Sequence, residues 1–198
     1  MALELIFTFF LVFLNGFFVA SEFAIVKVRA SQLEVRVQEG HRSATLAAHI
    51  VNHLDGYLAA TQLGVTLASL GLGWIGEPVF SKVFMSITHA IGIEIDEHLA
   101  ENIAFVFAFT LMTMLHIIFG ELAPKSVAIQ RAEQVTLIVS FPLRVFYLVF
   151  KPFIWALNGI SNILLRVVGI KPSHEVEVHS NDELKFLMQQ GHKTGAIE

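Results

Sequence analysis

Glu121 is the residue whose type and surroundings point most directly to chemistry. It follows the uncharged run 103–119 and Gly120, and it lies three residues before Pro124 and four before Lys125. A proline here would break or kink a helix and leave backbone carbonyls free beside a carboxylate. Carboxylate, hydroxyl and carbonyl oxygens are the ligands that Mg²⁺ takes in proteins. The spacing therefore predicts a cation site at Glu121, with a simple Glu121–Lys125 ion pair as the alternative.

Two other apolar runs carry polar groups that could complete such a site. Ser21 and Glu22 end the first run, where Glu22 is either a functional carboxylate or a boundary one paired with Lys27. The Ser21 hydroxyl could equally bond the carbonyl four residues earlier on its own helix. Thr66 and Ser69 share one helix face at i, i+3 spacing and could line a polar path. Glycines of the same run are typical of close helix packing or dimerisation: Gly64, Gly71 and Gly73.

The histidines give weaker signals. His116 is expected to be a hydrogen-bonded structural residue rather than a ligand. His49 and His53 have the i, i+4 spacing of a zinc pair, but two ligands on a solvated helix are weak support for a metal site. The sequence contains no phosphate-binding glycine loop and no Ser-His-Asp pattern, so we do not expect an enzyme.

The composition indicates an integral membrane protein. Apolar residues make up 55% of the 198 residues and charged residues only 15%, with a mean hydropathy of +0.65. Thirteen basic residues against 17 acidic ones give a net charge of −4, which argues against nucleic-acid binding. Cysteine is absent, so disulfides and thiol chemistry are excluded.

The apolar runs predict an all-α membrane protein with three transmembrane helices. These runs are Leu5–Val26, Tyr57–Gly76 and Ile103–Phe119, each near the roughly 20 residues that cross a bilayer. Val79–Ile93 is expected to be a separate short amphipathic piece. A fourth stretch, Val135–Ile170, contains basic residues at close spacing and two prolines that would divide it into segments. We interpret this stretch as a juxtamembrane belt lying in the lipid interface, with a fourth span as the alternative.

Basic residues in the short loops predict the orientation. They follow the first and third runs, whereas Lys82 is the one basic residue between the second and third. The positive-inside rule then places the N-terminus outside and the C-terminus in the cytoplasm of a multi-pass plasma-membrane protein. Ser31–Asp55 is expected to be a cytoplasmic amphipathic hairpin bent around Gly40. Residues 1–170 would form the transmembrane domain with its belt, and 171–198 would begin a cytoplasmic acidic helical linker.

Three motifs on the three predicted spans resemble the transmembrane domain of the CNNM/CorC family. They read NGFFVASEFA (15–24), QLGVTLASLGLGWIGEP (62–78) and HIIFGELAPKS (116–126). The resemblance implies a homodimer of three-span protomers in the lipid bilayer. It also implies cytoplasmic CBS domains, the part that would bind ATP, beginning just after the point where this sequence stops.

The same resemblance implies export of Mg²⁺, with Na⁺ as a proposed coupling ion. Glu121 would be the carboxylate ligand, with oxygens from Ser21, Gly120 and a turn at Gly64–Thr66. Ser69, Glu22, Pro124 and Lys125 would support the site. Val19 and Val65 stand where many relatives have Ser and Asn. Two alternatives therefore stay open: a membrane scaffold or sensor for the nucleotide-binding domains, and an exporter of another cation such as a polyamine.

Overall fold

The computed structural model describes residues 2–91, 97–167 and 169, and the secondary structure of this part is entirely helical. The elements, in chain order, are α1 (Ala2–Lys27), α2 (Ala30–Gln38), α3 (Arg42–Asn52), α4 (Leu54–Ile91), α5 (Glu97–Leu115), the π-helix η1 (His116–Leu122), α6 (Ala123–Gln130) and α7 (Ala132–Val167). The chain divides into two compact units, Met1–Leu157 and Asn158–Glu198. The first unit contains all of the elements from α1 to α6 and most of α7. The predicted linker, 171–198, lies outside the described residues.

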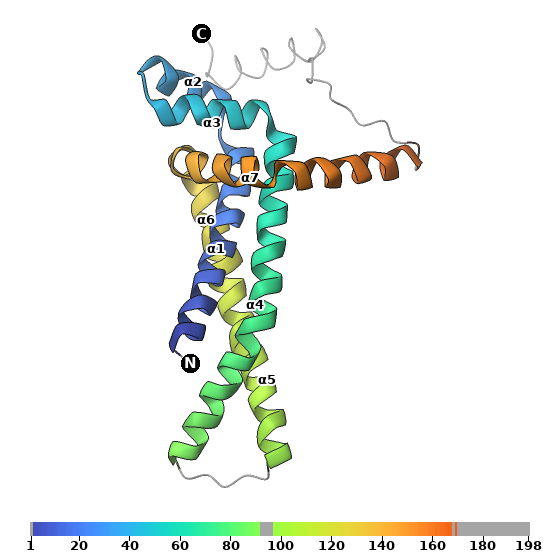
Figure 1. Cartoon of the computed structure of the whole chain (residues 1–198). Helices are drawn as coiled ribbons and strands as arrows, with labels where there is room; N and C mark the ends of the chain where they lie inside the picture. Colours follow the sequence, from blue (N-terminus) through green and yellow to red (C-terminus); the bar gives the residue numbers. More distant parts are fainter. Residues whose placement is uncertain (1, 92–96, 168, 170–198) are drawn as a thin grey trace, which may run out of the picture. The chain divides into compact units, whose positions relative to one another are not determined.

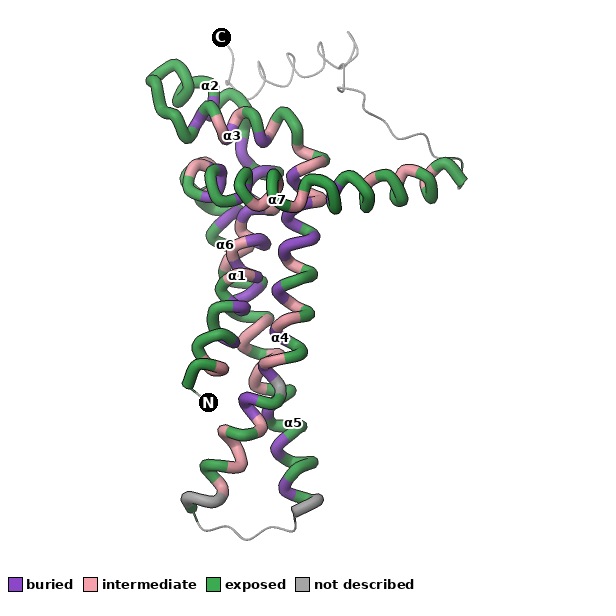
Figure 2. The backbone as a smooth tube through the Cα atoms, in the orientation of Figure 1, coloured by how far each residue is buried: buried purple, intermediate pink, exposed green. Residues whose placement is uncertain are grey.

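A bundle of three long helical segments forms the centre of this first unit. α1 packs along α4, and the continuous path α5–η1–α6 packs against both of them (Figure 1). One cluster of buried side chains joins Leu11 and Val12 of α1 to Leu72 of α4, with Met112 of α5 against it. Buried residues concentrate where these helices face one another (Figure 2). The all-α prediction is therefore confirmed for the described residues.

α4 differs from its prediction because it is one continuous helix. The expected span Tyr57–Gly76 and the described part of the expected separate piece Val79–Ile93, residues 79–91, both belong to Leu54–Ile91, with Pro78 inside the helix. At 1.5 Å per residue its 38 residues reach about 57 Å, well beyond a ~30 Å hydrocarbon core. Figure 1 shows α4 bending in its lower half, and a proline in a helix interior is a usual cause of such a bend.

α7 also runs unbroken through Pro142 and Pro152, so the expected division at these prolines is wrong. Each proline removes the donor for the carbonyl four residues earlier, at Ile138 and Leu148. Both prolines and both of these earlier residues are exposed. The backbone hydrogen-bond ladder of α7 is thus interrupted on the outer side of the helix, and the packed side is unaffected.

The part of α7 up to Leu157 lies across the end of the bundle, close to perpendicular to α1 and α4 (Figure 1). Leu143 is fully buried in a cluster with Ile25 of α1, Ile50 of α3 and Tyr57 of α4. Further along, Ile154 packs with Ala60 and Leu63 of α4. One face of this part of α7 is therefore a structural component of the bundle end.

The hairpin predicted within Ser31–Asp55 is confirmed as the pair α2 and α3, while Leu54 and Asp55 belong to the first turn of α4. The turn between them contains Gly40 at φ +83°, a left-handed conformation that favours glycine. Leu33 of α2 and Ala47 of α3 are buried together with Val28. The hairpin thus rests on the same end of the bundle as α7.

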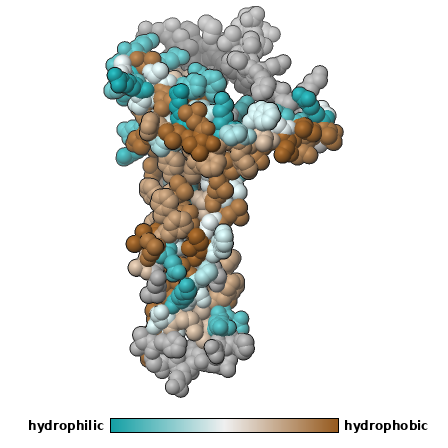
Figure 3. Space-filling model, in the orientation of Figure 1, coloured by the Kyte–Doolittle hydropathy of each residue, from teal (hydrophilic) through white to brown (hydrophobic). Residues whose placement is uncertain are grey.

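The exposed surface of the long helices is strongly apolar. On the face drawn in Figure 3, hydrophobic side chains cover most of the bundle, and hydrophilic side chains gather over α2 and α3. Within the described ranges, four helical stretches are long and apolar enough to cross a membrane: Ala2–Lys27, Leu54–Thr88, Leu99–Gln130 and Ala132–Val167. Large exposed apolar surfaces are stable in lipid and not in water, so these features fit a multi-pass membrane protein.

Candidate functional site

The helix that carries Glu121 continues through Pro124, so the predicted break or kink at this proline is wrong. It widens into the π-helix η1 and then continues directly as α6, with Pro124 in the first turn of α6. The N–H of Ala123 donates to the carbonyl of Ile118, five residues earlier. A proline ring clashes with the carbonyl four residues before it, here that of Gly120. The extra residue in a π turn shifts this carbonyl, so the chain stays helical. π segments are rare and recur at functional sites.

Asn15 holds the π-helix in place from the opposite side. Its Nδ2 donates to the Gly120 carbonyl at 3.0 Å, and its Oδ1 accepts a hydrogen bond from Ser69 Oγ at 3.1 Å. Pro124 has no N–H, so the ladder lacks a donor at this point and Asn15 supplies one nearby. Asn15 is only 2% exposed. One buried amide therefore joins α1, η1 and α4.

Glycines allow the backbones of α1 and η1 to approach each other closely. A Cβ on Gly16 would lie 2.8 Å from the Phe119 carbonyl oxygen and 2.9 Å from Pro124 Cγ. A Cβ on Gly120 would lie 2.8 Å from the His116 ring and 3.0 Å from the Asn15 amide nitrogen. Any larger residue at these positions would push the network apart.

The charged groups near η1 do not form the expected local pairs. Glu121 is exposed, and within the described residues its carboxylate makes no hydrogen bond or ion pair. Lys125 instead places its Nζ 4.4 Å above the ring centre of Phe23 and lies within electrostatic range of Glu22. Lys125 thus links α6 to α1, and the Glu121 carboxylate is left unpaired in this part of the chain.

The other predicted ligands lie on regular helices. Ser21 is buried and its Oγ donates to the Phe17 carbonyl at 2.7 Å, while the exposed Thr66 donates to the Gln62 carbonyl at 2.8 Å. Residues 64–66 are α-helical rather than a turn. Gly64 is buried against Phe18, whose ring atoms would lie 2.5 Å from an added Cβ. The structure thus brings together Ser69 and Gly120 through Asn15, and joins neither Ser21 nor Thr66 to Glu121 by a hydrogen bond.

The two histidines of the predicted pair lie side by side at the end of α3. The rings of His49 and His53 lie 4.3 Å apart, and His53 Nδ1 contacts the His49 carbonyl at 2.9 Å. Among the residues that the structure describes, no group of three or more His, Asp or Glu side chains could hold a metal ion. A cation at η1 would therefore take part of its ligands from backbone and hydroxyl oxygens.

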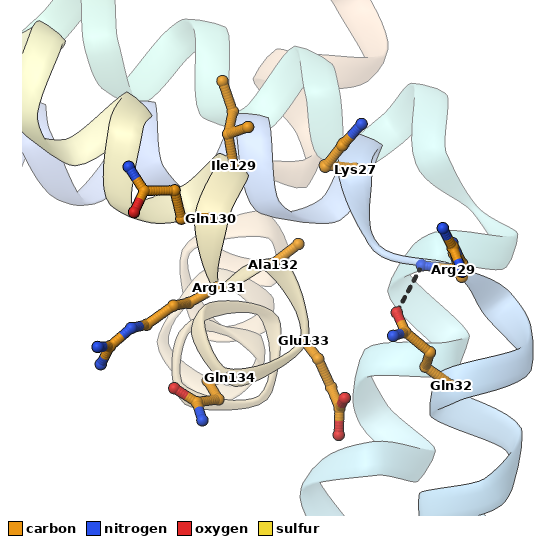
Figure 4. Close-up of a pocket in the computed structure, with 9 residues that line it drawn as sticks. All are labelled: Lys27, Arg29, Gln32, Ile129, Gln130, Arg131, Ala132, Glu133 and Gln134. Atoms are coloured by element: carbon orange, nitrogen blue, oxygen red, sulfur yellow. Dashed lines mark hydrogen bonds between the residues drawn. The ribbon is translucent and has the colours of Figure 1, made fainter.

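A polar cavity of about 390 Å³ opens at the same end of the bundle as α2 (Figure 4). Its walls come from the α1–α2 junction, the end of α6 and the start of α7, and three of its lining residues are basic: Lys27, Arg29 and Arg131. Glu133, the acidic lining residue, forms an ion pair with Arg36 at 2.7 Å. This positive lining would repel a cation, so the cavity is a poor vestibule for a cation site.

Sequence reasoning missed Asn15 as a site residue. The asparagine stands out as a polar interruption of the first apolar run, two turns before Ser21. Its partners lie 54 and 105 residues away along the chain. A polar amide within an apolar run could therefore be noticed in the sequence, but the residues that it bonds could not be predicted from it.

Replacing Gly16 with Ala should destabilise the protein, whereas Gly73→Ala should not. The new Cβ at position 16 meets a backbone oxygen, but nothing lies within 4 Å of a Cβ at Gly73. Overpacking typically costs about 1–3 kcal/mol, and alanine favours a helix by about 0.5–1 kcal/mol over glycine. Thermal unfolding in detergent should show a lower Tm for Gly16→Ala and an unchanged or higher Tm for Gly73→Ala. Equal Tm values would contradict the close approach.

Asn15→Ala should destabilise the bundle more than Ser69→Ala. The first change removes both hydrogen bonds of the amide, and the second removes one. Hydrogen bonds between membrane helices contribute about 0.6 kcal/mol on average and up to about 1.7. Unfolding of the two single variants and the double variant should give a coupling energy in this range. Strict additivity would mean that the Asn15–Ser69 bond contributes nothing.

Comparison with known proteins places this arrangement in a family. The family model described as the cyclin M transmembrane N-terminal domain, CNNM, matches residues 6–198. The UPF0053 protein YhdT of Bacillus subtilis is 46% identical over 188 residues, which are 94% of this chain and 40% of that protein. YrkA of the same organism is 42% identical, covering 94% of this chain and 43% of YrkA. The chain thus spans less than half the length of these relatives. The resemblance seen in the three motifs is confirmed, and the chain belongs to the CNNM transmembrane-domain family.

Proposed function

We propose that the protein exports divalent cations, most directly Mg²⁺, through an intramembrane site at Glu121. Membership of the CNNM family is consistent with a membrane role in divalent-cation transport. The observation that carries the proposal is the π-helix that presents an unpaired carboxylate on a scaffold held by the Asn15 amide. Irregular backbone and ionisable groups at membrane depth cost free energy, and where they occur they usually serve a function.

The oxygens available to a cation are of the kind that Mg²⁺ takes. Glu121 would supply charge, and the carbonyls of Gly120 and Gly64 would supply neutral oxygens. The hydroxyls of Ser21 and Thr66 donate their protons to carbonyls on their own helices, which leaves oxygen lone pairs able to face a cation. Ser69 supports the site through Asn15 rather than as a ligand. Mg²⁺ gives up water reluctantly, so a rigid scaffold of this kind suits it.

For the topology, we propose three spans, with α7 as a juxtamembrane belt. Support comes from the part of α7 up to Leu157, which crosses the end of α1 and α4 instead of running beside them (Figure 1). The same end of the bundle carries the basic residues of α2, α3 and this part of α7. By the positive-inside rule this end faces the cytoplasm of the plasma membrane, and the N-terminus lies outside.

The functional protein is proposed to be a homodimeric transporter and not an enzyme. Its large exposed apolar surface leaves room for a second copy as well as lipid. We propose that Na⁺ drives the exchange. We also propose that CBS domains, which would bind ATP, regulate the exchange in the whole protein.

One observation favours a scaffold or sensor as the second candidate. The polar groups of Asn15, Ser69 and Gly120 satisfy one another, so their packing role alone would explain them without an ion. Such a protein would only position nucleotide-binding domains. An exporter of organic cations such as polyamines would use Glu121 in the same way as a Mg²⁺ exporter.

Replacing Glu121 with Gln should abolish most Mg²⁺ flux. Even residues that only support a metal ligand contribute about 10–100-fold, so loss of the anionic ligand should reduce flux by more than about tenfold. The measurement is Mg²⁺ movement across proteoliposomes that contain a fluorescent Mg²⁺ indicator. Glu101→Gln is the matched control, because Glu101 is an exposed carboxylate in α5, the helix that leads into η1.

Each candidate function predicts a different result from these liposomes. Mg²⁺ flux that Glu101→Gln retains and Glu121→Gln loses supports the exporter. Putrescine flux that Mg²⁺ does not inhibit would assign an organic cation. Absence of any flux from the wild-type protein would favour the scaffold.

A further inference from the structure

A second cavity, of about 500 Å³, lies between α3 and α7, away from η1. Its lining combines two arginines with hydroxyl, imidazole and apolar side chains: Arg42, Thr45, Leu46, His49, Phe141 and Arg144. Four of these residues come from α3 and two from the part of α7 that packs on the bundle end. Neither the proposed cation site nor its alternatives use this cavity.

The two arginines of this cavity are not neutralised within the described part of the chain. Arg42 and Arg144 make no ion pair there, whereas the nearby Arg36 pairs with Glu133 at 2.7 Å and with Glu39 at 3.1 Å. No carboxylate lines the cavity. Arg144 lines the cavity together with residues of α3, and burial and the charges of His53 and Arg144 lower the pKa of His49. Within the described residues, the positive charge of the two guanidinium groups is therefore not balanced by a carboxylate.

The apolar side of the cavity continues onto an exposed stripe of α7. Phe141 is 70% exposed, and neighbouring residues on the same side of the helix are also exposed: Ile138, Val145, Leu148 and Val149. Hydrophobic side chains gather over α7 directly beside hydrophilic ones over α3 (Figure 3). A helix with this division of faces is typical of the boundary between lipid and water.

We propose that this cavity binds the headgroup of an anionic phospholipid. The Arg42 and Arg144 guanidinium groups would hold the phosphate by forked, charge-assisted hydrogen bonds, and the Thr45 hydroxyl would add a neutral donor. The acyl chains would leave along Phe141 and the exposed stripe. Leu46 and Phe141 favour a lipid over free phosphate, which has no apolar part to bury. A bound lipid would brace α3 against α7, the two helices that meet around Leu143.

Native mass spectrometry of the full chain, released from detergent with added lipid, tests this site. We expect phosphatidylglycerol to bind in preference to phosphatidylcholine, and the preference to fall by about tenfold or more in Arg42→Gln/Arg144→Gln. Lys151→Gln is the matched control, because it removes a positive charge from the same helix outside the cavity. Unchanged phosphatidylcholine binding by the double variant reports an intact fold.

Two results would overturn the proposal. Equal loss of phosphatidylglycerol preference in Lys151→Gln would mean that the general positive charge of α7 attracts the lipid. Displacement of bound phosphatidylglycerol by millimolar inorganic phosphate would assign the arginines to a free anion instead. Neither result depends on whether the protein transports cations.

Discussion

A single amide side chain ties the centre of this protein together. Asn15 bonds the Gly120 carbonyl and Ser69 at once, so α1, η1 and α4 meet at one buried point. In hydrocarbon no water could replace these partners, and an unsatisfied buried polar group costs about 1–3 kcal/mol. The close contact of Gly16 with the Phe119 carbonyl makes the arrangement possible. This contact holds η1, the segment that carries Glu121, against α1.

The network lies beside the candidate site and fixes the segment that carries it. Its hydrogen bonds hold the π-helix and occupy one lone pair of the Gly120 carbonyl, and the Glu121 carboxylate is carried at the adjacent position, unpaired within the described residues. In metal sites, groups behind the ligands commonly fix their orientation in this way. Lys125 also leaves the Glu121 carboxylate free, because it lies over Phe23 and near Glu22 instead of neutralising Glu121. A carboxylate without a protein partner on a rigid helix is suited to a cation that binds and dissociates reversibly.

Much of the fold could be predicted from the sequence, and the exceptions have physical causes. The long apolar runs predicted α1 and the membrane class, and Gly40 predicted the α2–α3 turn. Prolines were misleading, because Pro78, Pro142 and Pro152 all lie inside continuous helices whose packing outweighs a lost hydrogen bond. Pro124 likewise produces a π turn instead of a break. Asn15 could not be assigned, since its partners are distant in sequence and no local pattern encodes them.

The central claim is that Glu121 binds a divalent cation, and calorimetric titration of Mg²⁺ into the purified protein tests it most directly. Wild-type protein and Glu121→Ala would be compared, with Ca²⁺ and putrescine as competitors. We expect saturable Mg²⁺ binding by the wild type that the variant loses, because the other proposed ligands are neutral oxygens. Unchanged Mg²⁺ binding by Glu121→Ala would contradict the claim and remove the cation site from η1.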